Sequence, residues 1–122
     1  MIRTSSLLAC AALVVGAVVF PARAQDAPAG DTANGKRVYL ADGCFLCHGR
    51  AGQGGAYNGP APVLAQTEMP FDGFKGQLRA PSNDMPAYSE AVMSDKEIAD
   101  VYAFVRSLPG RRNPKDIAIL NN

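Results

Sequence analysis

The stretch Cys44-Phe45-Leu46-Cys47-His48 decides how this chain folds. Its pattern, C-x-x-C-H, is that of c-type haem attachment. Two thiols three positions apart lie on about one helical turn, so both can add to vinyl groups of one porphyrin. The next residue, His48, then lies beneath the iron, where its neutral imidazole can be the proximal ligand. The stretch therefore predicts one haem c, bound covalently through Cys44 and Cys47 and ligated by His48.

Three other interpretations of the two cysteines explain less. A thioredoxin-like C-x-x-C would lie in a βαβ pattern, and no such pattern surrounds this motif. A structural zinc site needs four ligands, whereas the chain after residue 24 offers two cysteines and one histidine. A disulfide between Cys44 and Cys47 would leave His48 without a role.

The first 24 residues have the pattern of a secretory signal peptide. Arg3 precedes a 14-residue apolar run over residues 7–20, and residues 22–24 form an A-x-A cleavage site. An uncleaved anchor is disfavoured because about 20 apolar residues are needed to span a bilayer. We expect cleavage after Ala24, export to the periplasm and no stable membrane insertion of the exported chain.

The exported chain is expected to be small and nearly neutral. The full sequence has 122 residues, so 98 remain after cleavage. Loss of Arg3 and Arg23 reduces the 12 Lys and Arg to 10, which face 11 Asp and Glu, a net charge of −1. This balance argues against nucleic acid as a partner, which would need a basic surface. Because so small a domain buries a limited fraction of its surface, we expect the haem-free protein to be poorly folded.

The pattern of the remaining chain predicts an all-α domain over residues 32–108. A flexible lead-in (25–31) precedes it and a tail (109–122) follows it. Asp31 is a candidate N-cap for the first helix, and Ser94 and Glu97 form a capping box for the last. Helical spacing of apolar residues predicts a short helix between these two. The three helices are expected over residues 32–41, 71–79 and 95–108.

A Gly- and Pro-rich segment over residues 49–62 follows the motif and is expected to be a loop. A ligating histidine usually donates its other ring N–H to a carbonyl or carboxylate, which fixes its tautomer. A rigid loop that returns beneath His48 can provide that acceptor. Pro60 is the candidate.

The sequence has no second histidine, so the sixth position of the iron is left to Met, Lys, Tyr, water or nothing. Of the four methionines, Met1 leaves with the signal peptide and three remain as candidates. Met93 directly precedes a helix cap and is interpreted as a packing residue. Met69 and Met85 both precede proline, which holds the preceding residue extended. Met85 follows His48 by 37 residues, enough to reach the opposite haem face, whereas Met69 follows it by 21. We therefore favour Met85 over Met69.

Ligation by His48 and Met85 would fill both axial positions and raise the haem potential. The expected chemistry is one-electron transfer without bond making, so the protein is expected not to be an enzyme. An open sixth position would instead permit a haem ligand sensor or a peroxidase. A second histidine or a distal acid–base residue would favour that alternative, and we identify neither in the sequence.

Taken together, these residues resemble the class I monohaem cytochrome c family over about residues 32–108. In that family the first helix carries a glycine and an aromatic residue four positions later, which Gly35 and Tyr39 match. The last helix crosses it at close range, and Val101 and Phe104 correspond to the crossing residues. The resemblance implies the cytochrome c fold, with these helices crossing and the remaining chain wrapped around the haem.

The resemblance also covers the two loops that face the haem. Gly59-Pro60 resembles the family's loop whose proline carbonyl accepts the haem histidine N–H, and the segment around Met85 resembles the one that delivers the axial methionine. The chain has no tryptophan for the propionate contact seen in part of the family, and Arg79 or Tyr88 could replace it.

The family implies a function as a periplasmic electron carrier. The implied partners are redox proteins: a dehydrogenase, a membrane complex, or a terminal oxidase or reductase. The alternative within this chemistry is a dedicated electron-accepting subunit of one periplasmic dehydrogenase.

Overall fold

The computed structural model describes residues 27–55 and 60–121. The signal peptide predicted for residues 1–24 and the predicted loop residue Gly59 lie outside these ranges. Within them the chain is helical and has no strand, which confirms the all-α prediction. The elements are α1 (Thr32–Ala41), α2 (Phe45–His48), α3 (Phe71–Arg79), α4 (Asp95–Ser107), and the 3-10 helices η1 (Pro114–Asp116) and η2 (Ala118–Leu120).

The described helices include none that is long and apolar enough to cross a membrane.

Local signals place the helix boundaries as predicted. The Asp31 side chain accepts hydrogen bonds from the first-turn backbone of α1, which begins at Thr32. Both halves of the predicted capping box are present at α4, because Ser94 Oγ accepts from Glu97 N and Glu97 Oε2 accepts from Ser94 N. Helix α3 has the predicted bounds, and α4 ends at Ser107, one residue early.

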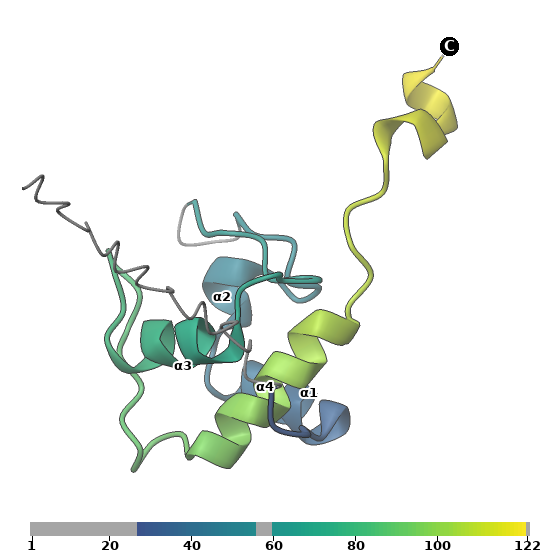
Figure 1. Ribbon diagram of the computed structural model, residues 1–122. Coiled ribbons are helices and arrows are strands. Elements are labelled where there is room, and N and C mark those ends of the chain that lie inside the picture. The colour runs from purple at the N-terminus through teal and green to yellow at the C-terminus, as the bar shows by residue number, and fades with distance from the viewer. Residues whose placement is uncertain (1–26, 56–59, 122) are drawn as a thin grey trace, which may run out of the picture.

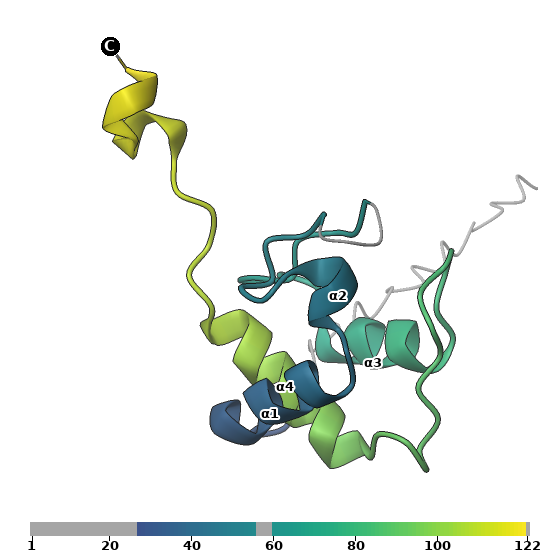
Figure 2. The same ribbon diagram turned by 180° about the vertical axis from the view of Figure 1, so that it is seen from behind.

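Helices α1 and α4 cross at close range (Figure 1 and Figure 2). A Cβ on Gly35 would overlap the backbone carbonyl of Asp100 and lie 2.9 Å from the Cβ of Phe104. Next to the crossing, the rings of Tyr39 and Phe104 meet edge to face, with centroids 5.4 Å apart. Glycine at position 35 is therefore what allows the two backbones to approach.

A buried carboxylate joins the same two helices. Asp100 in α4 is fully buried, and one of its oxygens accepts from Asp31 N at 2.7 Å. The other accepts from Asn34 Nδ2 and Lys96 Nζ, each at 2.7 Å. Burial acts to raise the pKa of Asp100, but these hydrogen bonds outweigh it and hold the pKa below its usual value. The sequence analysis did not identify this residue.

The hydrophobic core lies between α1, α3 and α4. Met93 is fully buried in it, as expected for a packing residue. Phe74 and Phe71 of α3 meet the ring of Tyr102 in α4, with centroids 5.1 and 5.4 Å away. These contacts fix α3, and with it one wall of the cavity described below. The core side chains are Val38, Tyr39, Phe74, Leu78, Met93, Ile98, Val101, Tyr102, Phe104 and Val105.

The chain after α4 runs away from the helical domain and carries η1 and η2 at its far end (Figure 1). Arg111 Nη2 donates to the Gln53 carbonyl at 3.1 Å near the start of this tail. At the far end, Ile119 is 79% exposed and Leu120 is 63% exposed. The tail therefore presents apolar side chains to solvent.

Candidate functional site

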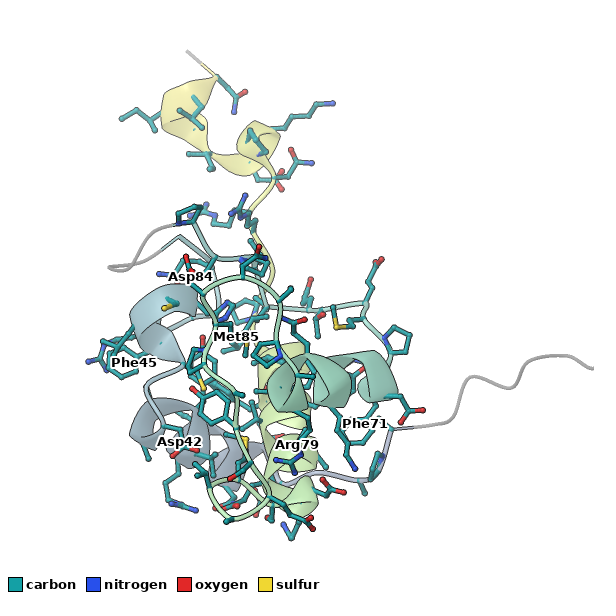
Figure 3. All side chains as sticks on the ribbon, turned by 90° about the vertical axis from the view of Figure 1, so that its left-hand side faces the viewer. Asp42, Phe45, Phe71, Arg79, Asp84 and Met85 are labelled. Atoms are coloured by element: carbon teal, nitrogen blue, oxygen red, sulfur yellow. The ribbon has the colours of Figure 1, made fainter. Side chains whose placement is uncertain are left out.

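A cavity of about 850 Å³ is bounded by α2, α3 and the loops that follow each of them. Cys44, Cys47 and His48 line it, and so do Met69 and Met85. Figure 3 views the molecule from the side of the segment between α3 and α4, which carries Asp84 and Met85. All four residues predicted to hold a haem thus border one cavity, together with the methionine that was the alternative ligand.

Tight turns on either side of α2 position the C-x-x-C-H stretch. Gly43 and Gly49 flank it with φ of 74° and 79°, a conformation that favours glycine. Within it, His48 N donates to the Cys44 carbonyl at 3.0 Å. The buried hydroxyl of Tyr39 donates to the Gly49 carbonyl at 2.8 Å and so joins α1 to the end of α2. The short helix is therefore held at both ends.

The His48 ring is held by a backbone carbonyl. His48 is 7% exposed, and its Nδ1 lies 3.0 Å from the carbonyl oxygen of Pro62. A carbonyl can only accept, so Nδ1 carries the proton and Nε2 keeps its lone pair for a metal. The prediction of a carbonyl acceptor is confirmed, but the choice of Pro60 is wrong.

The loop geometry explains the two-residue difference. Gly54 N donates to the His48 carbonyl at 2.8 Å, and Gly55 N donates to the Ala61 carbonyl at 3.1 Å. A Cβ on Gly54 would lie 2.6 Å from that same Ala61 oxygen. The part of the loop that returns towards His48 therefore passes directly against the backbone of Gly54. This close approach brings Pro62 beneath His48.

The two thiols lie on the same wall as His48. Both Cys44 and Cys47 are half-buried and free of disulfide bonding. Burial raises the pKa of the Cys44 thiol to about 11. Burial also raises the pKa of the neighbouring Tyr88 phenol, whose hydroxyl donates to the Asp42 carbonyl at 3.1 Å. Both groups are therefore neutral at neutral pH.

Met85 and Met69 differ in how they are held. Met85 is half-buried and packs against the core, and Gln77 Nε2 lies 3.7 Å from its sulfur, within hydrogen-bonding reach. Met69 is 44% exposed, although its carbonyl accepts from the Tyr102 hydroxyl at 2.7 Å. Both side chains border the cavity, but Met85 has the more protected thioether.

The end of α3 holds the segment that carries Met85. Tyr88 N donates to the Leu78 carbonyl at 2.9 Å. Arg79 Nη1 donates to the carbonyls of Tyr88 and Met93, each at 2.8 Å, and its Nη2 donates to Asp95 at 2.7 Å. The expectation that Arg79 contacts a haem propionate does not fit these bonds. Of the two candidates, Tyr88 is the one that lines the cavity.

The residues around the cavity fit a c-type haem. Its volume lies within the roughly 300–1,000 Å³ of cofactor sites, and much of its wall is apolar. Thiol, imidazole and thioether are the donors that c-type haem uses. Within residues 27–55 and 60–121, by contrast, no group of three or more His, Cys, Asp or Glu side chains could hold a bare metal ion. The apolar part of the wall includes Leu46, Leu64, Phe74, Leu78 and Val101.

Comparison with known proteins also indicates a c-type cytochrome. Residues 30–105 match the family described as cytochrome c oxidase, cbb3-type, subunit III. The chain is 34% identical over 106 residues to cytochrome c-555 of Methylococcus capsulatus, an alignment that covers 86% of this chain and 81% of that protein. No solved structure matches the chain. The protein therefore belongs to the class I monohaem c-type cytochromes, which transfer electrons and are not enzymes.

Proposed function

We propose that this protein carries single electrons in the periplasm through one haem c. Cys44 and Cys47 would hold the haem covalently, and His48 and Met85 would ligate its iron. The observation that carries this proposal is that these four side chains border a single cavity. The predicted signal peptide over residues 1–24 supports the periplasmic location, and residues 32–108 would form the haem domain.

On the His48 side, the protein orients the proposed ligand through a backbone carbonyl. The Pro62 carbonyl holds the Nδ1 proton and leaves Nε2 basic. Since His48 is buried, water has little access to compete for that nitrogen. When bound, the haem supplies a one-electron redox couple whose potential is raised by His/Met ligation.

On the opposite side, the choice of Met85 is supported by its surroundings. Its thioether is half-buried and lies near the Gln77 amide, whereas Met69 is 44% exposed. A ligand held away from water keeps the sixth position closed, which suits electron transfer without bond making.

One observation favours a second candidate function. Ile119 and Leu120 are exposed at the far end of the tail. Exposed apolar side chains of this kind suit a lasting protein contact. They favour the alternative of a dedicated electron-accepting subunit bound to one periplasmic dehydrogenase. Co-purification with such an enzyme, lost when residues 113–122 are deleted, would support this alternative over a free carrier.

The test is an optical titration of the haem-loaded protein with carbon monoxide. The reduced wild type and Met69→Ala should remain low-spin and ignore carbon monoxide, whereas Met85→Ala should bind it. Intact mass should rise by one haem under denaturing conditions. A wild type that binds carbon monoxide directly would move the function to a sensor or haem enzyme. A Met69→Ala variant that binds it would overturn the choice of Met85.

A further inference from the structure

A single guanidinium, that of Arg79, makes two of the hydrogen bonds that hold the segment carrying Met85. Residues 80–93 join α3 to α4 and contain no helix or strand. Arg79, the last residue of α3, donates through one nitrogen to two carbonyls of this segment, at Tyr88 and at Met93. Its other terminal nitrogen pairs with Asp95 at the first turn of α4. One side chain therefore fastens the segment at two points and joins both helices that flank it.

The two carbonyls that Arg79 bonds, those of Tyr88 and Met93, both follow Met85 in the chain. Between Ala80 and Met85, the described contacts are weaker and run through Gln77, which hydrogen bonds to Ser82 at 3.3 Å and approaches the Met85 sulfur. Beyond Met85, the strong bonds are those of Tyr88 and Met93. Without the Arg79 guanidinium, the segment after Met85 would lose two of these hydrogen bonds at once.

We propose that Arg79 is a positioning residue for the sixth iron ligand. Its guanidinium holds residues 80–93 against α3 so that Met85 stays at the cavity and resists displacement by outside ligands. This inference rests on the proposed ligation by Met85. The residue acts through the loop backbone and does not contact the haem site itself, since Arg79 is not among the residues that line the cavity.

The chemistry of arginine suits this role. A guanidinium presents several N–H donors in a rigid planar fork, so it can reach two carbonyls and a carboxylate at once. A lysine at this position would keep the charge and could keep the pairing with Asp95. It could not reproduce the planar fork, so Arg79→Lys should loosen the segment while leaving the ion pair.

Loosening the segment should be visible as easier access to the sixth position. An outside ligand binds only when Met85 has left, so its apparent affinity scales with the fraction of molecules in the open state. Loss of the two carbonyl anchors should raise that fraction about tenfold, which corresponds to about 1.4 kcal/mol.

The experiment measures imidazole binding to the oxidised, haem-loaded protein by optical titration. Arg79→Gln should bind imidazole about tenfold more tightly than the wild type, with Arg79→Lys in between. Lys75→Gln is the matched control, because Lys75 pairs with the same carboxylate, Asp95, but does not bond to the segment. This control should bind imidazole like the wild type. Unfolding of each variant is followed in parallel to separate local release from general destabilisation.

The double variant Arg79→Gln with Met85→Ala shows whether the tighter imidazole binding is caused by release of Met85. Once Met85 is absent, Arg79→Gln should tighten imidazole binding no further, because the step that it favours has been removed. Equal tightening with and without Met85 would overturn the role of Arg79, as would an unchanged affinity in Arg79→Gln and Arg79→Lys. If Met85→Ala itself leaves imidazole binding unchanged, the ligation by Met85 fails instead.

Discussion

Asp100 offers a direct test of how α1 and α4 are joined. The Asp100→Asn substitution keeps the size of the side chain but exchanges one acceptor oxygen for an NH₂ donor. Asp100 accepts from Asp31 N, Asn34 Nδ2 and Lys96 Nζ. Asparagine can keep one oxygen facing one or two of these donors, but its amide hydrogens must then face another donor. At least one buried bond is therefore lost and replaced by an unfavourable contact.

The expected loss of unfolding free energy in Asp100→Asn depends on which of the three donors can bond to water instead. Lys96 is 74% exposed, so its ammonium can turn to water and the loss of its ion pair should cost little. A hydrogen bond to a charged group contributes about 1.5–3 kcal/mol, and the part-buried bonds from Asp31 and Asn34 are of that kind. We expect Asp100→Asn to lower the free energy of unfolding by about 2–3 kcal/mol. For a domain of this size the Tm should fall by about 10–20 °C.

The pH dependence gives an independent check on the sign. The folded pKa of Asp100 is lowered, so its carboxylate stabilises the fold fully above the ordinary Asp pKa of about 3.9. That stability is lost as the pH falls through the lower, folded-state pKa. The gap in Tm between wild type and Asp100→Asn should therefore be constant near neutral pH and should narrow as the pH falls below about 3.9.

The assay is thermal unfolding of the haem-loaded proteins, followed by circular dichroism from pH 7 to pH 3. Lys96→Gln is the control and should lose much less stability at pH 7 than Asp100→Asn, because Lys96 is exposed. A loss below about 0.5 kcal/mol in Asp100→Asn would refute the reasoning, since a change that small is typical of surface substitutions. So would a gap in Tm that stays constant down to the lowest pH at which both proteins fold.

Two further predictions concern the helix crossing and the sulfur of Met85, the proposed sixth ligand. Gly35→Ala should cost about 1–3 kcal/mol or more in urea unfolding, because its Cβ overlaps the facing backbone. Gly76→Ala, where a Cβ meets nothing within 4 Å, should instead be neutral or stabilising, and equal losses in both variants would contradict the crossing geometry. Gln77→Leu should lower the reduction potential by roughly 10–40 mV in spectroelectrochemistry, because a hydrogen bond to Met85 sulfur weakens electron donation to oxidised iron. An unchanged or raised potential would count against that contact.

The parts of the fold that could be predicted from the sequence are those with local causes. The capping box at Ser94 and Glu97 acts over three residues, and the Asp31 cap acts within one helical turn. The C-x-x-C-H stretch is likewise a local pattern. Such features do not depend on where the rest of the chain lies, so they can be recognised in the sequence before any tertiary contact is known.

The features that were missed depend on residues far apart in the chain. Asp100 bonds to Asp31 across 69 positions, and the only local signal was an acidic residue between two apolar ones on α4. Pro60 was chosen as the acceptor for His48 because it lies in the Gly- and Pro-rich loop, and the family resemblance favoured it too, whereas the path of that loop selects Pro62. That path depends on close backbone approaches that composition does not encode.

The two sides of the cavity are built on different principles, and this has a consequence for function. His48 is held within a short helix closed by neighbouring turns, and its acceptor follows only 14 positions later. Met85 is held by side chains of α3 that reach across a segment without regular structure. Side chains such as Gln77 and Arg79 can be exchanged without altering the C-x-x-C-H stretch, where the haem is proposed to attach. Under the proposed ligation by Met85, substitutions on this side should therefore adjust the potential and the access of outside ligands.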